Sequence, residues 1–148
     1  RALMSLRVEK GYGSWSREYS PEYYPHEVGF ERLCKMDKPF LNRDAAIAAM
    51  KDDPRETLIM LHLTEADVTA SNADATGGEP IFFDGEGIGR VTSGAYGYSV
   101  EMSLAMGYVK AGTAKAGDQV DVMVLGQPHK ARVLAEPPFD PKGERLRA

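Results

Sequence analysis

Six short apolar runs separated by turn residues most constrain what this chain can fold into. They lie at residues 57–63, 80–83, 88–93, 104–109, 119–124 and 130–134. Asp84-Gly85 suits a two-residue hairpin turn, and Gly117-Asp118 and Gly126-Gln127 mark turns between the last three runs. The first run is apolar on both faces, which is typical of a central strand. This spacing predicts a six-stranded Greek-key barrel or a sandwich.

The N-terminal residues predict a helix rather than a strand. Ser5–Tyr12 reads as a helix that Gly11 and Gly13 bring to an end. Leu3, Leu6 and Lys10 lie on one face of this helix, with Met4 and Val8 beside them. The apolar side chains of this face form a stripe that needs a packing partner. The chain starts at Arg1 and not at Met. We therefore expect it to be the C-terminal part of a longer protein.

The segment from Ser14 to Lys51 has a mixed pattern. A loop rich in Ser, Pro, Tyr and Glu is expected over residues 14–26, and Val28–Met36 is expected to be extended, with Phe30 and Leu33 as apolar anchors. Asn42 is a candidate N-cap for a helix over Arg43–Met50. A charged run at 51–56 separates this part from the strands. The predicted class is α+β, mainly β, divided into residues 1–52 and a barrel over 53–148.

Composition excludes several functions. The net charge of −4 argues against nucleic-acid binding, and no apolar run reaches the length of a membrane span. Cys34 is the single cysteine, so no internal disulfide can form and a reducing compartment is expected. The three histidines lack metal-ligand spacing, so no metal site is predicted. His62 is expected in a barrel wall and His129 in an exposed turn.

Several blocks of sequence follow, in order, the pattern of one family. They are SLRVEKGY at 5–12 with Trp15, PHEVGF at 25–30, KMDK at 35–38, FLNRDA at 40–45, GEPI at 78–81, GIGRVTSG at 87–94 and LAMGYV at 104–109. From about Ala2 to Arg147, the chain resembles the C-terminal portion of the glycine cleavage T-protein (aminomethyltransferase) family. Within that family it looks most like the folate-binding half of dimethylglycine and sarcosine dehydrogenases.

The resemblance implies a chemistry for the parent protein. A flavin (FAD) in an upstream domain oxidises a small methylated amine, and tetrahydrofolate captures the one-carbon unit. In the family, the catalytic Asp and a folate-gripping Glu precede the point where this chain begins. A family Arg also aligns with Leu3, so that contact is lost or replaced. We expect residues 1–52 to be the tail of a folate-binding domain and the isolated chain to have no catalytic residues. The upstream folate-binding and flavin domains are the expected partners, a homo-oligomer stays open, and the expected location is the cytoplasm or, in a eukaryote, the mitochondrial matrix.

Three residues are candidate folate contacts. Tyr12 and Trp15 could stack on a pterin or aminobenzoyl ring, although aromatic side chains beside a glycine break also commonly close a core. Arg145 could reach the folate glutamate tail, or could belong to a solvated terminus. Arg7 and Glu9 are expected to have structural roles, and Ser93 has no neighbouring base in the sequence that would make it a nucleophile.

A second hypothesis is non-enzymatic. A T-protein-like fold could serve as a folate-binding or assembly module, like the iron–sulfur assembly relatives of the family. Those relatives have cysteine between glycine and tyrosine in a Lys-Gly-Cys-Tyr motif, whereas this chain reads Lys10-Gly11-Tyr12. That difference favours the enzymatic hypothesis.

Overall fold

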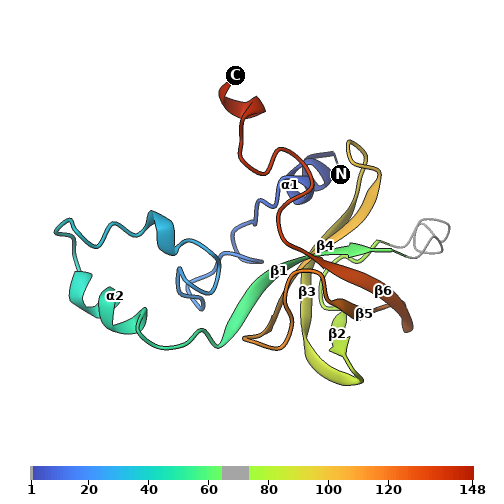
Figure 1. Ribbon diagram of the computed structural model, residues 1–148, viewed down its shortest axis with the longest axis horizontal. Coiled ribbons are helices and arrows are strands. Elements are labelled where there is room, and N and C mark those ends of the chain that lie inside the picture. Colours follow the sequence, from blue (N-terminus) through green and yellow to red (C-terminus); the bar gives the residue numbers. More distant parts are fainter. Residues whose placement is uncertain (1, 65–73) are drawn as a thin grey trace.

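The six predicted strands form a closed antiparallel barrel. A computed structural model describes residues 2–64 and 74–148 (Figure 1). The strands are β1 (Glu56–Leu63), β2 (Pro80–Phe83), β3 (Glu86–Gly97), β4 (Met102–Lys110), β5 (Gln119–Val124) and β6 (Gln127–Leu134). Around the barrel they follow the order β1-β4-β3-β2-β5-β6. Because β2, β3 and β4 are consecutive neighbours and β1 returns beside β4, this is a Greek key, and the predicted barrel is confirmed.

Two tight turns fix the register of the hairpins. Asp84 and Gly85 have φ values of 50° and 83°, as a two-residue turn between β2 and β3 requires. Leu125 and Gly126, with φ values of 50° and 78°, do the same between β5 and β6. The first turn was predicted correctly. The prediction for the second was one residue late, because Gln127 already pairs with Val124 in the ladder.

Every second side chain along the strands points into the barrel and fills it. One part of the barrel wall also buries side chains on its outer face. Leu61, Ile81 and Val122 are fully buried in the interior cluster. On the outer face a second cluster forms from Val8, Met60, Leu104 and Met106. The helix α1 (Ala2–Glu9) supplies Val8 to this cluster, so it packs against the outside of the barrel. Residues 103–109 of β4 are therefore buried on both faces.

Helix α1 begins and ends earlier than the sequence predicts. It runs from Ala2 to Glu9, not from Ser5 to Tyr12. The Gly11 N–H donates to Val8 O at 3.0 Å and the Tyr12 N–H donates to Arg7 O at 2.8 Å, while Gly11 has a φ of 69°. These two bonds form a Schellman cap, so Gly11 ends the helix as predicted.

The segment between α1 and the barrel contains two short helices, η1 (Glu31–Leu33) and α2 (Arg43–Ala49). The expectation of an extended Val28–Met36 was wrong, because Gly29 at a φ of 74° and the η1 turn interrupt it. Leu33 is not an anchor, since its side chain is 60% exposed. Asn42 precedes α2 as predicted but makes no side-chain cap bond, because its left-handed φ of 62° is not the usual N-cap conformation.

The C-terminal residues leave the barrel after β6 and cross back to α1 (Figure 1). They end in the short helix η2 (Arg145–Arg147). Across the described ranges 2–64 and 74–148, no helix is both long and apolar enough to cross a membrane.

Candidate functional site

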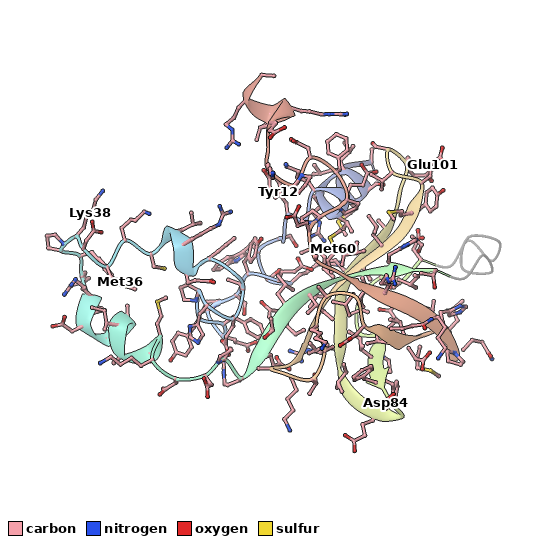
Figure 2. The ribbon with its side chains drawn as sticks, in the orientation of Figure 1. Tyr12, Met36, Lys38, Met60, Asp84 and Glu101 are labelled. Carbon is pink, nitrogen blue, oxygen red and sulfur yellow. The ribbon has the colours of Figure 1, made fainter. Side chains whose placement is uncertain are left out.

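The candidate site is a groove of about 430 Å³ between α1 and the C-terminal segment. Its lining is mainly apolar and exposed, with a few charged side chains at the rim: Leu3, Leu6, Arg7, Lys10, Tyr12, Phe139, Asp140, Arg145 and Leu146. Figure 2 shows Tyr12 between α1 and the C-terminal segment. Exposed leucines and an exposed tyrosine in one concave surface are typical of a binding site rather than of a closed core.

Backbone and charge contacts hold the two walls of the groove together. The Phe139 N–H donates to Glu9 O at 3.1 Å. Lys10 Nζ lies 3.2 Å from Asp140 Oδ2 and also donates to the Asp140 carbonyl. Both side chains of this ion pair are largely buried. The C-terminal segment is therefore fixed to α1 along one edge of the groove.

Asp140 also organises the last turn of the chain. Its Oδ1 accepts the backbone N–H groups of Glu144 at 2.7 Å and Arg145 at 3.2 Å. Burial raises the pKa of Asp140, but the bonds from Arg145, Lys10 and Glu144 outweigh it, so the net shift is downward. Asp140 is therefore ionised near neutral pH and acts as an anchor rather than as a proton donor.

The Arg145 guanidinium stays available at the rim. Its Cζ lies 5.3 Å from the centre of the Phe139 ring, which is a cation–π distance. Among the described residues no carboxylate forms an ion pair with this side chain. A guanidinium beside an apolar groove suits an anionic group of a bound molecule, because Arg binds carboxylates in a bidentate geometry.

A buried network supports the floor of the groove. Arg7 donates to Tyr12 O at 3.0 Å, to Glu18 Oε2 at 3.1 Å and to Ser93 Oγ at 2.6 Å. Burial raises the pKa of the Glu18 carboxyl, yet hydrogen bonds from Ser93, Thr92 and Ser14 and the charge of Arg7 lower it overall. This network joins α1, the following loop and strand β3.

The structure separates the three predicted folate contacts. Tyr12 and Arg145 line the same groove. Trp15 instead lines another hollow, of about 400 Å³, together with Arg17, Tyr23 and Arg90. The Tyr12 and Trp15 side chains are 52% and 73% exposed, which contradicts the interpretation that they close a core.

Other residues that the sequence singled out have structural roles. Glu9 is buried and accepts the Ser99 N–H at 3.0 Å, and the buried Ser93 accepts from Arg7, as the structural interpretations predicted. His62 lies in the wall strand β1, where burial lowers its pKa. The prediction of an exposed turn for His129 was wrong, because it pairs with Val122 inside β6 and is half-buried.

Sequence reasoning missed Lys10, Phe139 and Asp140 as parts of the site. A signal existed in the run Pro138-Phe139-Asp140-Pro141, where an acid and an aromatic lie between two prolines beyond the last strand. Prolines restrict the backbone and commonly fix a turn. The residues across the groove are about 130 positions away, so spacing alone could not pair them.

The described side chains of the groove suit the binding of a small molecule. The groove offers an exposed ring, apolar walls and a guanidinium, and its one carboxylate is bound to Lys10. Within residues 2–64 and 74–148, no group of three His, Cys, Asp or Glu residues is placed to hold a metal ion. Together these features define a Greek-key barrel domain with a ligand-sized groove between α1 and the C-terminal segment.

Comparison with known proteins identifies the family. Residues 58–140 match the model of the glycine cleavage T-protein C-terminal barrel domain, and the chain belongs to this family. The chain is 34% identical to mouse (Mus musculus) mitochondrial dimethylglycine dehydrogenase over 138 residues, which is 92% of this chain and 15% of the relative. It is also 34% identical to a probable aminomethyltransferase of Haloarcula marismortui, over 92% of this chain and 37% of the relative.

A solved structure supports the same assignment. The crystal structure of glycine cleavage system aminomethyltransferase T from Bartonella henselae superposes with a TM-score of 0.80 at 25% identity. The match covers 95% of this chain and 38% of the relative. This chain therefore spans well under half the length of each of these three proteins.

Proposed function

We propose that this chain is the C-terminal part of a tetrahydrofolate-dependent aminomethyltransferase or demethylating dehydrogenase of N-methyl amines such as dimethylglycine or sarcosine. The groove between α1 and the C-terminal segment forms one wall of the folate site. The observation that carries the proposal is that Tyr12 and Arg145 both line this groove. Similarity to dimethylglycine dehydrogenase and aminomethyltransferases supports the choice of chemistry.

The groove residues suit the chemical parts of folate. The exposed ring of Tyr12 offers a face on which a pterin or aminobenzoyl ring could stack. The Arg145 guanidinium suits a glutamate carboxylate. Leu3 and Leu6 would keep water from the apolar part of the molecule. Bound tetrahydrofolate would accept a one-carbon unit, while these side chains would hold and orient it.

The rest of the reaction is assigned to other parts of the parent protein. If the parent protein is a dehydrogenase, its upstream domains hold the FAD that oxidises the methylated amine and supply the catalytic carboxylates. The isolated chain is then inactive and binds tetrahydrofolate weakly. The groove supports this assignment, because Asp140 is an ion-paired anchor and Arg7 is bound to Glu18.

A nuclear magnetic resonance titration with 5-formyltetrahydrofolate tests the groove. Weak, millimolar binding should shift the amide signals of Leu6, Tyr12 and Arg145. Arg145→Gln should weaken binding at least threefold, whereas Arg147→Gln should not, because the Arg147 side chain donates to the Lys142 carbonyl at 2.5 Å. Shifts centred on Trp15, or equal effects of the two variants, would show that the site is elsewhere. Micromolar binding would show that this chain forms more than one wall of the folate site.

A further inference from the structure

Residues 2–30, here called the strap, lie against the outside of the barrel. Within the strap, α1 contacts β3 and β4, and Val8 is fully buried in the outer cluster with Leu104 and Met106. Figure 1 shows α1 beside the barrel, whereas the chain between the strap and β1 reaches away from it. The apolar contacts of the strap are thus made with strands that are distant from it in the sequence.

Three glutamates of the strap are buried at equal intervals of nine positions: Glu9, Glu18 and Glu27. Glu9 accepts the Ser99 N–H at 3.0 Å, just beyond β3. Glu18 accepts the Thr92 hydroxyl of β3 at 2.6 Å. A buried carboxylate without donors is strongly unfavourable, and a strap that moved along the barrel would leave these carboxylates without them. The hydrogen bonds therefore specify one register of the strap on the barrel.

The strap also covers Tyr108 on β4. Side chains alternate along a strand, and the next residue, Val109, belongs to the interior cluster, so Tyr108 points out of the barrel. It is nevertheless fully buried. Its hydroxyl donates to Glu18 O at 2.6 Å, and its ring stacks on that of Tyr23 with the centres 3.9 Å apart. The outer face of β4 thus presents a large aromatic side chain that the strap removes from water.

The connection from residue 31 to residue 54 begins and ends at the same place. Glu27, near the end of the strap, accepts the Arg55 N–H at 3.1 Å, and the Arg55 side chain donates to each Glu27 carboxylate oxygen at 2.9 Å. Between these points, neither η1 nor α2 buries a side chain. A cut in the connection would therefore leave the buried contacts of the strap in place.

We infer that the outer face of β3 and β4 is a binding surface that recognises the strap as a separate polypeptide. The buried side of α1 and the three buried glutamates supply this recognition, and the covalent connection is not required for it. The unit that folds together is then residues 2–30 with residues 55–148, although the match to the family model starts only at residue 58. Recognition of the strap brings the α1 wall of the groove to the C-terminal segment, whatever the groove binds.

A chain cut in the connection tests the inference. A recognition site for a sequence-specific protease is inserted between Lys38 and Pro39, and the folded chain is cut there. The two pieces should co-elute in size-exclusion chromatography at about 10 µM, and after separation in urea they should recombine with a Kd below about 1 µM. Tenfold dilution should lower the Tm of the cut chain but not that of the uncut chain, because only the cut chain dissociates when it unfolds.

Two substitutions in α1 give a matched comparison. Val8 is fully buried, whereas Leu6 on the same helix is 56% exposed. Val8→Asp should raise the Kd for recombination at least about 100-fold, because it places an unpaired carboxylate in the outer cluster, and Leu6→Asp should change the Kd less than about threefold. Both substitutions lie in the strap piece, so the barrel piece is the same in each measurement.

The alternatives give different results. Pieces that separate at about 10 µM, or that do not recombine when urea is removed, would overturn the inference, because the fold would then require the covalent connection. Equal effects of Val8→Asp and Leu6→Asp would also overturn it, because the buried side of α1 would then not carry the recognition. Recombination that only Val8→Asp weakens would support the binding surface on β3 and β4.

Discussion

Arg7 Nη1 lies 3.1 Å from Glu18 Oε2, and the Glu18 carboxylate is completely buried. The two residues belong to different elements, because Arg7 is in α1 and Glu18 is in the following loop. Thr92 on strand β3 donates to the other Glu18 oxygen at 2.6 Å. This pair thus ties the groove, the loop and the barrel into one unit.

Glu18→Gln should destabilise the chain strongly. The substitution keeps the side-chain size but removes the negative charge, which leaves the largely buried Arg7 without its counter-ion. Breaking a buried ion pair on one side costs about 3–5 kcal/mol, of which we expect at least about 2 kcal/mol in the free energy of unfolding. Urea unfolding measures this change.

A matched substitution separates burial from charge. Asp44 pairs with Arg43 at 3.5 Å, but the Asp44 side chain is 97% exposed. Asp44→Asn should therefore change the free energy of unfolding by less than about 0.5 kcal/mol. If both variants lost the same stability, the buried pair would have no special role in holding the groove.

Acid should destabilise the chain through Glu27. Hydrogen bonds from the Arg55 side chain, at 2.9 Å to each carboxylate oxygen, lower the pKa of Glu27 to about 2 against the opposing effect of burial. Since the folded pKa lies below the ordinary value of 4.5, this stabilisation is complete above pH 4.5 and is lost as the pH falls toward 2. Urea midpoints measured between pH 2 and 6 should decrease across that window.

Glu27→Gln should reduce the slope of this decrease without removing it. Glu18, Glu56 and Asp140 also have pKa values that the fold lowers, and they keep part of the acid dependence. Glu31→Gln, at an exposed position in η1, is the control and should leave the slope unchanged. A Glu27→Gln profile identical to that of the parent chain would assign the acid dependence to other groups.

The sequence predicted the barrel well because its information is local. Alternating apolar runs and the Asp84-Gly85 turn determine strands and register within a few residues of one another. The sites depend on distant pairs, such as Lys10 with Asp140 and Glu27 with Arg55, and nothing in their spacing predicts them. Trp15 illustrates the same limit, because it lies close to Tyr12 in sequence and yet lines a different hollow.

The prediction of an extended segment around η1 was wrong for another reason. Phe30 and Leu33 are apolar and suggested an extended anchor, but Leu33 lies exposed at the end of η1. In a single sequence, an exposed apolar residue looks the same as a core residue.

A close approach of strands makes Gly89 sensitive to substitution. A Cβ atom at Gly89 would lie 2.0 Å from the Tyr108 carbonyl oxygen on β4, so the backbone would have to move. At Gly87, two residues earlier on β3, the nearest atom would be a Phe82 ring carbon at 3.7 Å, which is ordinary contact. Gly89→Ala should cost about 2–3 kcal/mol and Gly87→Ala less than about 1 kcal/mol. Equal costs in thermal or urea unfolding would contradict the β3–β4 geometry.

Gly11 combines two requirements, and a pair of alanine substitutions can separate them. Its φ of 69° strains any residue with a Cβ, and a Cβ there would lie 2.5 Å from Pro137 Cγ on the C-terminal segment. Gly112 has a similar φ of 77° but open space around it. Gly112→Ala should therefore cost only the backbone strain, about 1 kcal/mol, while Gly11→Ala should cost about 1 kcal/mol more.

Because the extra cost arises from pushing the C-terminal segment away from α1, Gly11→Ala should also speed hydrogen exchange of the Phe139 N–H, which donates to Glu9 O. Unchanged exchange at Phe139, with equal losses of stability in the two variants, would show that Pro137 moves aside freely and that Gly11 does not position the groove.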